Sequence, residues 1–175
     1  MGNVTPTRAE RNNNPGNLNY IQPGHAFNGQ VGIEIIPVGV DEKPRFGRYD
    51  TMFNGDRAAV ETILIDVFHH ELLTTRHLIG DETYGWAPGS DDNDDASYGN
   101  RVISYINAQF GAEPGAEGAF TLDTDLRQSV SDPHFLSVLS MGMYIVENGH
   151  EPVGMTEEQH DASVTSAMQA QGILS

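Results

Sequence analysis

One segment of the chain is apolar on most faces of the helix that it predicts. Asp132 can cap a helix and Pro133 fits its first turn, so the helix begins there. Asn148 and Gly149 provide a stop. A helix without a polar stripe needs other elements to cover it, so we expect this one to be buried. Its apolar residues are Phe135, Leu136, Val138, Leu139, Met143, Ile145 and Val146.

Helical spacing of apolar residues recurs elsewhere in the chain. One helix is expected from Asp56 to about Leu72, with Asn54 and Asp56 as candidate cap residues. A short helix is expected from Thr75 to Ile79. The remaining two helices are one through Tyr98, Val102, Ile103, Ile106 and Phe110, and a last one to about Gln171 that begins with the capping-box pair Thr156 and Gln159.

Residues 1–50 differ from the rest, because they are rich in Gly, Pro and Asn and contain a single β-like run, Val31 to Val40, interrupted by Pro37. Residues 111–118 read as a loop. The chain has 175 residues, no internal repeat and no low-complexity linker, which suits one domain over 1–175. The expected fold class is therefore mainly α (α+β), with a small irregular or β portion near the N-terminus.

Composition argues against several classes of function. The formal net charge is −16, and Lys43 is the only lysine among nine basic residues. Binding to a phosphate backbone needs clusters of Lys and Arg, so no nucleic acid partner is expected. The absence of cysteine excludes a disulfide framework, a thiolate metal site and a Cys nucleophile.

Membrane and export signals are also missing from the sequence. Residues 1–10 are polar and lack the apolar core of a signal peptide. No later apolar run approaches the length of a membrane span. We therefore expect no membrane span, and export would need another route.

An Asn-rich stretch from Arg11 to Leu18 predicts a shaped polar loop. Its Asn side chains bond to nearby backbone and tolerate left-handed dihedral angles, while Pro15 restricts one dihedral angle and Gly16 frees the next. Amides held in this way suit a ligand rich in hydroxyl and acetamido groups. The alternative interpretation is a turn with no ligand.

The carboxyl group with the most interesting position is that of Glu147, at the end of the apolar helix. The partial negative charge at a helix C-terminus and the apolar neighbours both disfavour its ionised form, so its pKa should be raised. A raised pKa is what a general acid acting near neutral pH requires. The alternative is a solvent-facing Glu at a helix end.

We expect no metal ion or cofactor. His69, His70 and Glu71 are adjacent, so on a helix their side chains point in different directions. The segment from Asp91 copies the first positions of a calcium loop, but Ala96 replaces the glycine that the loop needs and Val102 stands where its last Glu belongs. No Gly-rich phosphate loop precedes a helix.

The order of these motifs resembles a family of phage-associated proteins, which are commonly taken to be virion-borne or prophage-encoded muralytic proteins related to the lysozyme superfamily. The resemblance spans almost the whole chain, and residues 31–43 look like an insertion relative to it. It is carried, in order, by Arg11 to Asn17, Phe27-Asn28-Gly29, Phe46-Gly47-Arg48-Tyr49-Asp50, Gly55-Asp56-Arg57-Ala58-Ala59, Trp86-Ala87-Pro88 with the acidic tract and Tyr98, and Glu147-Asn148-Gly149.

The resemblance implies a lysozyme-like domain and assigns roles to particular residues. In the glucosaminidases and lytic transglycosylases of the superfamily, the helix that bears the catalytic Glu comes first, whereas here it comes last. A circular permutation of the core would explain this order. Glu147 then corresponds to the catalytic acid. The residues expected at the glycan are Asn13, Asn14 and Asn17 in the loop, with Tyr49, Trp86 and Tyr98 as stacking or cleft-wall residues.

The implied function is cleavage of peptidoglycan glycan strands by a single Glu, in a virion-associated protein or one delivered to the periplasm. The acidic residues Asp50, Asp91, Asp92, Asp94 and Asp95 are candidates for a second carboxylate, although such a run is more often a solvated turn. The alternative is a non-catalytic virion structural or ejected protein, with other virion proteins as partners, that keeps the fold and binds glycan. A carbohydrate-binding or assembly module is a third reading.

Overall fold

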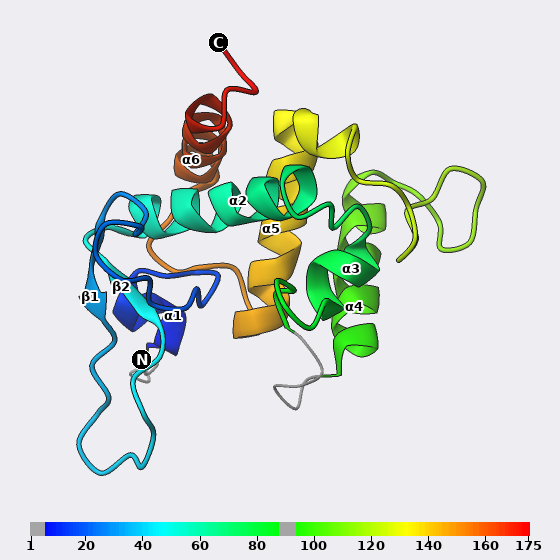
Figure 1. Cartoon of the computed structure of the whole chain (residues 1–175). Coiled ribbons are helices and arrows are strands. Elements are labelled where there is room, and N and C mark those ends of the chain that lie inside the picture. The colour runs from blue at the N-terminus through cyan, green and yellow to red at the C-terminus, as the bar shows by residue number, and fades with distance from the viewer. Residues whose placement is uncertain (1–5, 88–93) are drawn as a thin grey trace.

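The computed structural model describes residues 6–87 and 94–175 (Figure 1). Over these residues it contains six α-helices and a small two-stranded antiparallel sheet, which confirms the mainly α class. The elements are α1 (Arg8–Asn12), β1 (Gln30–Ile33), β2 (Gly47–Tyr49), α2 (Met52–Phe68), α3 (Thr75–Gly80), α4 (Asp95–Gln109), the 3-10 turn η2 (Ser129–Ser131), α5 (Pro133–Asn148) and α6 (Glu157–Ala170).

The helix α5 lies in the core, as its sequence predicts. Asp132 accepts a hydrogen bond from the backbone N–H of His134, Pro133 occupies the first turn, and Gly149 ends the helix with φ of 78°. Figure 1 shows α5 behind α2, with α4 on one side and α6 on the other. Its fully covered apolar side chains include Leu136, Leu139 and Met143. One face is less covered, since His134 is exposed and Met141 and Ile145 are half-buried. Packing against α2, α4 and α6 sets where its last turn, with Glu147, must lie.

The helix α2 begins earlier than its apolar spacing predicts. Its N-cap is Thr51, whose side chain accepts from the N–H of Asn54, and the helix ends at Phe68 rather than near Leu72. The prediction that Asp56 caps this helix is wrong. Asp56 lies inside the helix and is completely buried.

A buried polar cluster explains the position of Asp56. Its Oδ2 accepts a hydrogen bond from the His160 Nδ1, at 2.8 Å, and another from the Ser163 hydroxyl on α6. The His160 Nε2 lies 3.1 Å from the Ser137 carbonyl oxygen of α5, which can only accept. Both ring nitrogens therefore face acceptors, which suits the imidazolium form and links α2, α5 and α6.

The N-terminal portion contains less strand and more helix than its composition predicts. Arg11 and Asn12 belong to α1 rather than to the loop, because Thr7 and Glu10 form a complete capping box. The loop begins at Asn13, and both Asn13 and Asn17 have left-handed backbone angles, with φ of 49°. Of the predicted run Val31 to Val40, only the part up to Ile33 is a strand, paired with β2.

The last helix and its start are as predicted. Thr156 and Gln159 form a capping box in which each side chain bonds to the other residue's backbone N–H. Within the described residues, none of the helices combines the length and the apolar character needed to cross a membrane.

We predict that the stability of the protein depends on pH through His160. Burial lowers the pKa of His160, but its hydrogen bond with Asp56 and the charge of that carboxylate outweigh burial and raise the pKa above 6.5. A histidine whose pKa is raised by folding contributes stability that is complete below pH 6.5 and declines as the pH rises through the folded-state value. Urea denaturation between pH 5 and 9 should show that decline, at a pH above about 6.5.

The matched variants are Asp56→Asn and His25→Gln. Asp56→Asn should lower the free energy of unfolding by about 3 kcal/mol at pH 6 and remove the decline above it, because the buried imidazolium loses its counter-charge. His25 is exposed, so His25→Gln should keep both the stability and the pH profile. An unchanged pH profile in Asp56→Asn would contradict the assignment.

Candidate functional site

The carboxyl group of Glu147 lies half-buried at the end of α5, between two hydrogen-bond donors. The Nδ2 of Asn17 is 3.3 Å from its Oε2, and the hydroxyl of Tyr98 on α4 is 3.0 Å from its Oε1. The same hydroxyl lies 3.1 Å from the carbonyl oxygen of Met143. Asn17 lies 130 positions and Tyr98 lies 49 positions from Glu147 in the chain, yet both side chains contact its carboxyl group.

The Asn-rich loop is tied to α5 by the residue that follows Glu147. The Nδ2 of Asn148 donates to the carbonyl of Tyr144 in its own helix, at 2.9 Å, and to the carbonyl of Pro15 in the loop, at 3.0 Å. Sequence reasoning placed Asn148 only in the helix stop and missed this role. Because Glu147 and Asn148 are neighbours, the bond to Pro15 also sets where Asn17 meets the acid.

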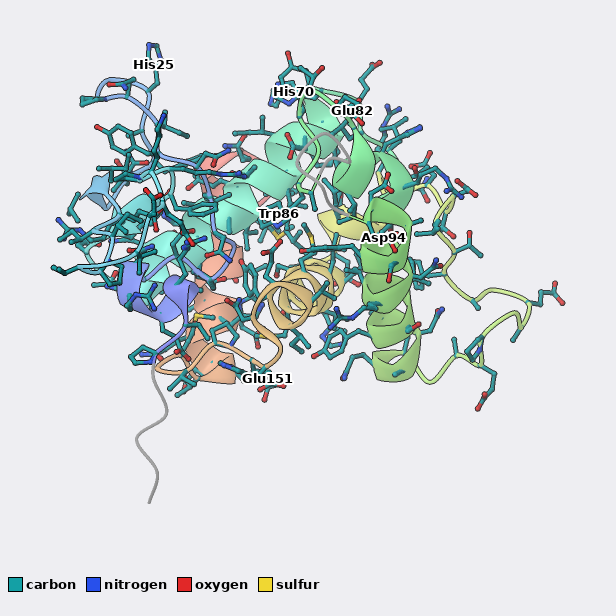
Figure 2. All side chains as sticks on the ribbon, turned by 90° about the horizontal axis from the view of Figure 1, so that it is seen from below. His25, His70, Glu82, Trp86, Asp94 and Glu151 are labelled. Carbon is teal, nitrogen blue, oxygen red and sulfur yellow. The ribbon has the colours of Figure 1, made fainter. Side chains whose placement is uncertain are left out.

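Trp86 completes this arrangement by packing on the loop. An added Cβ at Gly16 would lie 2.6 Å from the Cζ2 atom of Trp86, so only glycine permits the contact. Figure 2 shows Trp86 near the centre of the molecule, between α2 and α5. Trp86 and Glu147 line the same cavity, and the indole lowers the pKa of Glu147. The loop is equally close to α2, where a Cβ on Gly55 would lie 1.7 Å from the carbonyl oxygen of Asn13.

The pKa of Glu147 is raised above its ordinary value, chiefly because burial disfavours the ionised form. The hydrogen bonds from Asn17 and Tyr98, the nearby Trp86 indole and the positive charge of Arg45 act in the opposite direction. The direction agrees with the sequence prediction. Burial thus favours the protonated form of the carboxyl group, while the neighbouring donors stabilise the anion once the proton has left.

Two adjoining cavities surround this group. One, of about 200 Å³, is lined by Glu147, and the next, of about 210 Å³, extends towards α2 and Tyr84. Gly16, Asn17, Arg45 and Trp86 line both cavities, so the two form one cleft. The Oδ1 of Asn17 is buried and has no hydrogen-bond partner, which leaves an acceptor for a ligand.

The other predicted glycan-contacting residues lie outside the cleft. Asn14 is completely buried, and its Nδ2 donates to the carbonyls of Leu18 and Gly47, each at 2.9 Å. The Nδ2 of Asn13 lies 3.1 Å from the carbonyl oxygen of Tyr49, and Tyr49 is itself only 2% exposed. These three residues hold the loop against β2. The structure therefore gathers Asn17, Trp86 and Tyr98 around Glu147, but not Asn13, Asn14 or Tyr49.

The candidates for a second carboxylate are distributed differently. Asp50 is exposed and accepts from the Nδ2 of Asn54, at 2.8 Å. Asp94 caps α4 and Asp95 lies in its first turn. Asp91 and Asp92, like Pro88 and most of the predicted acidic turn, lie outside the described residues. None of the described candidates lines the cleft.

A larger cavity, of about 300 Å³, lies between α4, α5 and the start of α6 and contains none of the predicted site residues. Among the residues that the structure describes, no group of three or more His, Asp or Glu side chains is arranged to hold a metal ion. The cleft beside Glu147 is therefore the better candidate, because a buried acid, an unpaired acceptor and an aromatic side chain meet there.

Comparison with known proteins adds no further assignment, because neither a protein-family model nor a curated protein matches this chain.

We expect Tyr98→Phe to raise the pKa of Glu147 further. The substitution removes a donor that stabilises the carboxylate and leaves the ring in place. The Glu147 carboxyl carbon can be followed by NMR titration and identified by its loss in Glu147→Gln. Tyr20→Phe, which removes a hydroxyl elsewhere, should leave this pKa unchanged. A fall in the pKa in Tyr98→Phe would contradict the geometry.

A second prediction concerns the contact between the loop and the indole. Gly16→Ala should destabilise the protein by about 2 kcal/mol, because the new methyl group overlaps the Trp86 ring. Trp86 is the only tryptophan, so a change in its emission reports the displacement directly. The control is Gly99→Ala, whose added Cβ would meet only the Leu122 side chain. An emission spectrum that stays the same in Gly16→Ala would rule out the contact.

Proposed function

We propose that this protein is a peptidoglycan-degrading glycosidase in which Glu147 is the general acid. The observation that carries the proposal is the half-buried Glu147 carboxyl group, with a raised pKa and two side-chain donors, in a cleft lined by an aromatic ring and an unpaired amide oxygen. A glycosidase needs a protonated carboxyl group beside the glycosidic oxygen. The resemblance to phage-associated muralytic proteins points to the same residue.

The surroundings of Glu147 suit both the protonated carboxyl group and the carboxylate that remains after proton transfer. Burial raises the pKa of the carboxyl group and so favours its protonated form. When Glu147 gives its proton to the oxygen of the breaking bond, Asn17 and Tyr98 are placed to donate to the new carboxylate. While Glu147 is protonated, the Tyr98 hydroxyl can instead donate to the Met143 carbonyl, so neither state leaves it unpaired.

The positively charged sugar ring that forms when the bond breaks can react in two ways. In a hydrolase, a second carboxylate activates water or attacks the ring, and in a substrate-assisted or transglycosylase-type reaction a group of the sugar itself attacks. The proposal includes both a lysozyme or glucosaminidase and a lytic transglycosylase. As in the proteins that it resembles, the protein would act from a phage virion or in the periplasm.

A non-catalytic virion protein that binds glycan is the alternative. The observation that favours it is the net charge of −16, since proteins that lyse cell walls are often cationic, as suits an anionic wall. The charge inside the cleft is less strongly negative than that of the whole chain, because Arg45 lines both cavities.

The test is the release of fragments from purified cell walls by the wild type and by Glu147→Gln. We expect wild-type cleavage and a loss of about 100-fold or more in the variant, because the amide cannot donate the acid's proton. Anhydro ends on the products would identify a transglycosylase, and reducing ends a hydrolase.

The matched control is Glu151→Gln, since Glu151 is an exposed acid four residues further along the chain, beyond the end of α5. It should cleave as the wild type does. Equal inactivity of the wild type and Glu147→Gln, with wall binding retained, would overturn the enzymatic proposal in favour of the binding protein.

A further inference from the structure

The cleft contains a second acidic side chain that sequence reasoning did not select. Asp66 lies near the end of α2 and lines the cavity next to that of Glu147. Glu147 lines only the first cavity and Asp66 only the second, while Asn17 and Trp86 line both. The two carboxyl groups therefore stand at different positions along one cleft.

Half of the Asp66 carboxyl group has no partner. Asp66 is 3% exposed, and its Oδ1 lies 3.0 Å from the Nδ1 of His70. Its Oδ2 is buried without a hydrogen bond. A buried carboxyl oxygen without a donor is unfavourable, so a ligand that brings a donor to this side of the cavity would be stabilised there. Burial also raises the pKa of Asp66 to about 6, although the hydrogen bond from His70 opposes this.

The side chains next to Asp66 form an aromatic wall. The Tyr84 ring stacks on His70, with 3.8 Å between ring centroids and an interplanar angle of 17°. Tyr84 is 51% exposed and lines the same cavity as Asp66. Figure 2 shows His70 at the edge of the molecule, away from the central Trp86. A large exposed ring beside a buried acceptor is a common arrangement for binding a sugar, which offers an apolar face and hydroxyl donors.

We propose that Asp66 and Tyr84 form a second sugar subsite, in which the Asp66 Oδ2 accepts a hydrogen bond from a hydroxyl or acetamido N–H of the glycan. The inference rests on the proposed function of the Glu147 cavity. Among the described residues that line the cleft, the unpaired buried side-chain atoms are Oδ1 of Asn17 and Oδ2 of Asp66. Both are acceptors, so a ligand that hydrogen-bonds to them must bring donors. Asp66 is thereby a specificity residue that binds a sugar beside the one that is cleaved.

The test measures binding of soluble glycan oligomers of alternating N-acetylglucosamine and N-acetylmuramic acid, from two to eight sugars long, by calorimetry. The parent is Glu147→Gln, so that no oligomer is cut. Asp66→Asn in this parent keeps an oxygen for His70 and places an amide N–H₂ group where Oδ2 stood. Oligomers that reach both cavities should bind about tenfold more weakly, while the shortest should bind equally well.

Two further variants keep the result interpretable. Tyr84→Ala removes an exposed ring, which does not endanger folding. It should likewise weaken the binding of long oligomers and leave the binding of the shortest unchanged. Glu82→Gln removes an exposed acid from the same segment, near His70 in Figure 2, and should bind every length as the parent does.

Unchanged binding of long oligomers by both Asp66→Asn and Tyr84→Ala would overturn the subsite. If wild-type cleavage and the defect of Glu147→Gln persist in that case, the proposed function stands without it. Failure of the parent to bind glycan of any length, together with an inactive wild type, would overturn the subsite and the proposed function together.

Discussion

The pair of hydrogen bonds made by Asn148 connects the two halves of the site. One bond stays within α5 and the other reaches the carbonyl of Pro15, 133 residues away in the chain. Because α5 packs against α2, α4 and α6, its last turn has little freedom to move, and the loop takes its position from that turn. The left-handed Asn17, the packing of Gly16 on Trp86 and the bond from Asn17 to Glu147 all depend on that position.

The chemistry of the cleft comes from a balance between burial and hydrogen bonding. Burial raises the pKa of Glu147, while Asn17, Tyr98 and Trp86 limit the rise and remain to stabilise the anion. At Asp66 the same balance is incomplete, because only one carboxyl oxygen has a partner. Asp56 also has one unpaired oxygen, Oδ1, but its Oδ2 accepts from both His160 and Ser163, and these bonds link α2 to α6. The three carboxyl groups thus differ in their partners, and we assign them different proposed roles: general acid for Glu147, ligand acceptor for Asp66 and a link between helices for Asp56.

Local patterns in the sequence predicted the helices well where the signal is itself local. The capping box at Thr156, the start at Asp132 and Pro133 and the stop at Gly149 are confirmed, because each depends on residues within one turn. The direction of the Glu147 pKa shift was predictable for a related reason, since apolar neighbours in the helix foretold its burial. The misplacement of Asp56 shows the limit, because an Asp before an apolar run reads as a cap whether or not a distant His160 pairs with it.

The sequence alone determined the mainly α class, the buried helix, the acid at its end and an Asn-rich loop shaped by left-handed residues. Only the tertiary structure decided which amides face the acid: Asn17 does, whereas Asn13 and Asn14 hold the loop to its neighbours. It also decided that Asp66, rather than Asp50 or Asp94, lines the cleft. The physical reason is that these roles depend on contacts between side chains that are distant in the chain, and such contacts leave no periodic or local pattern in the sequence.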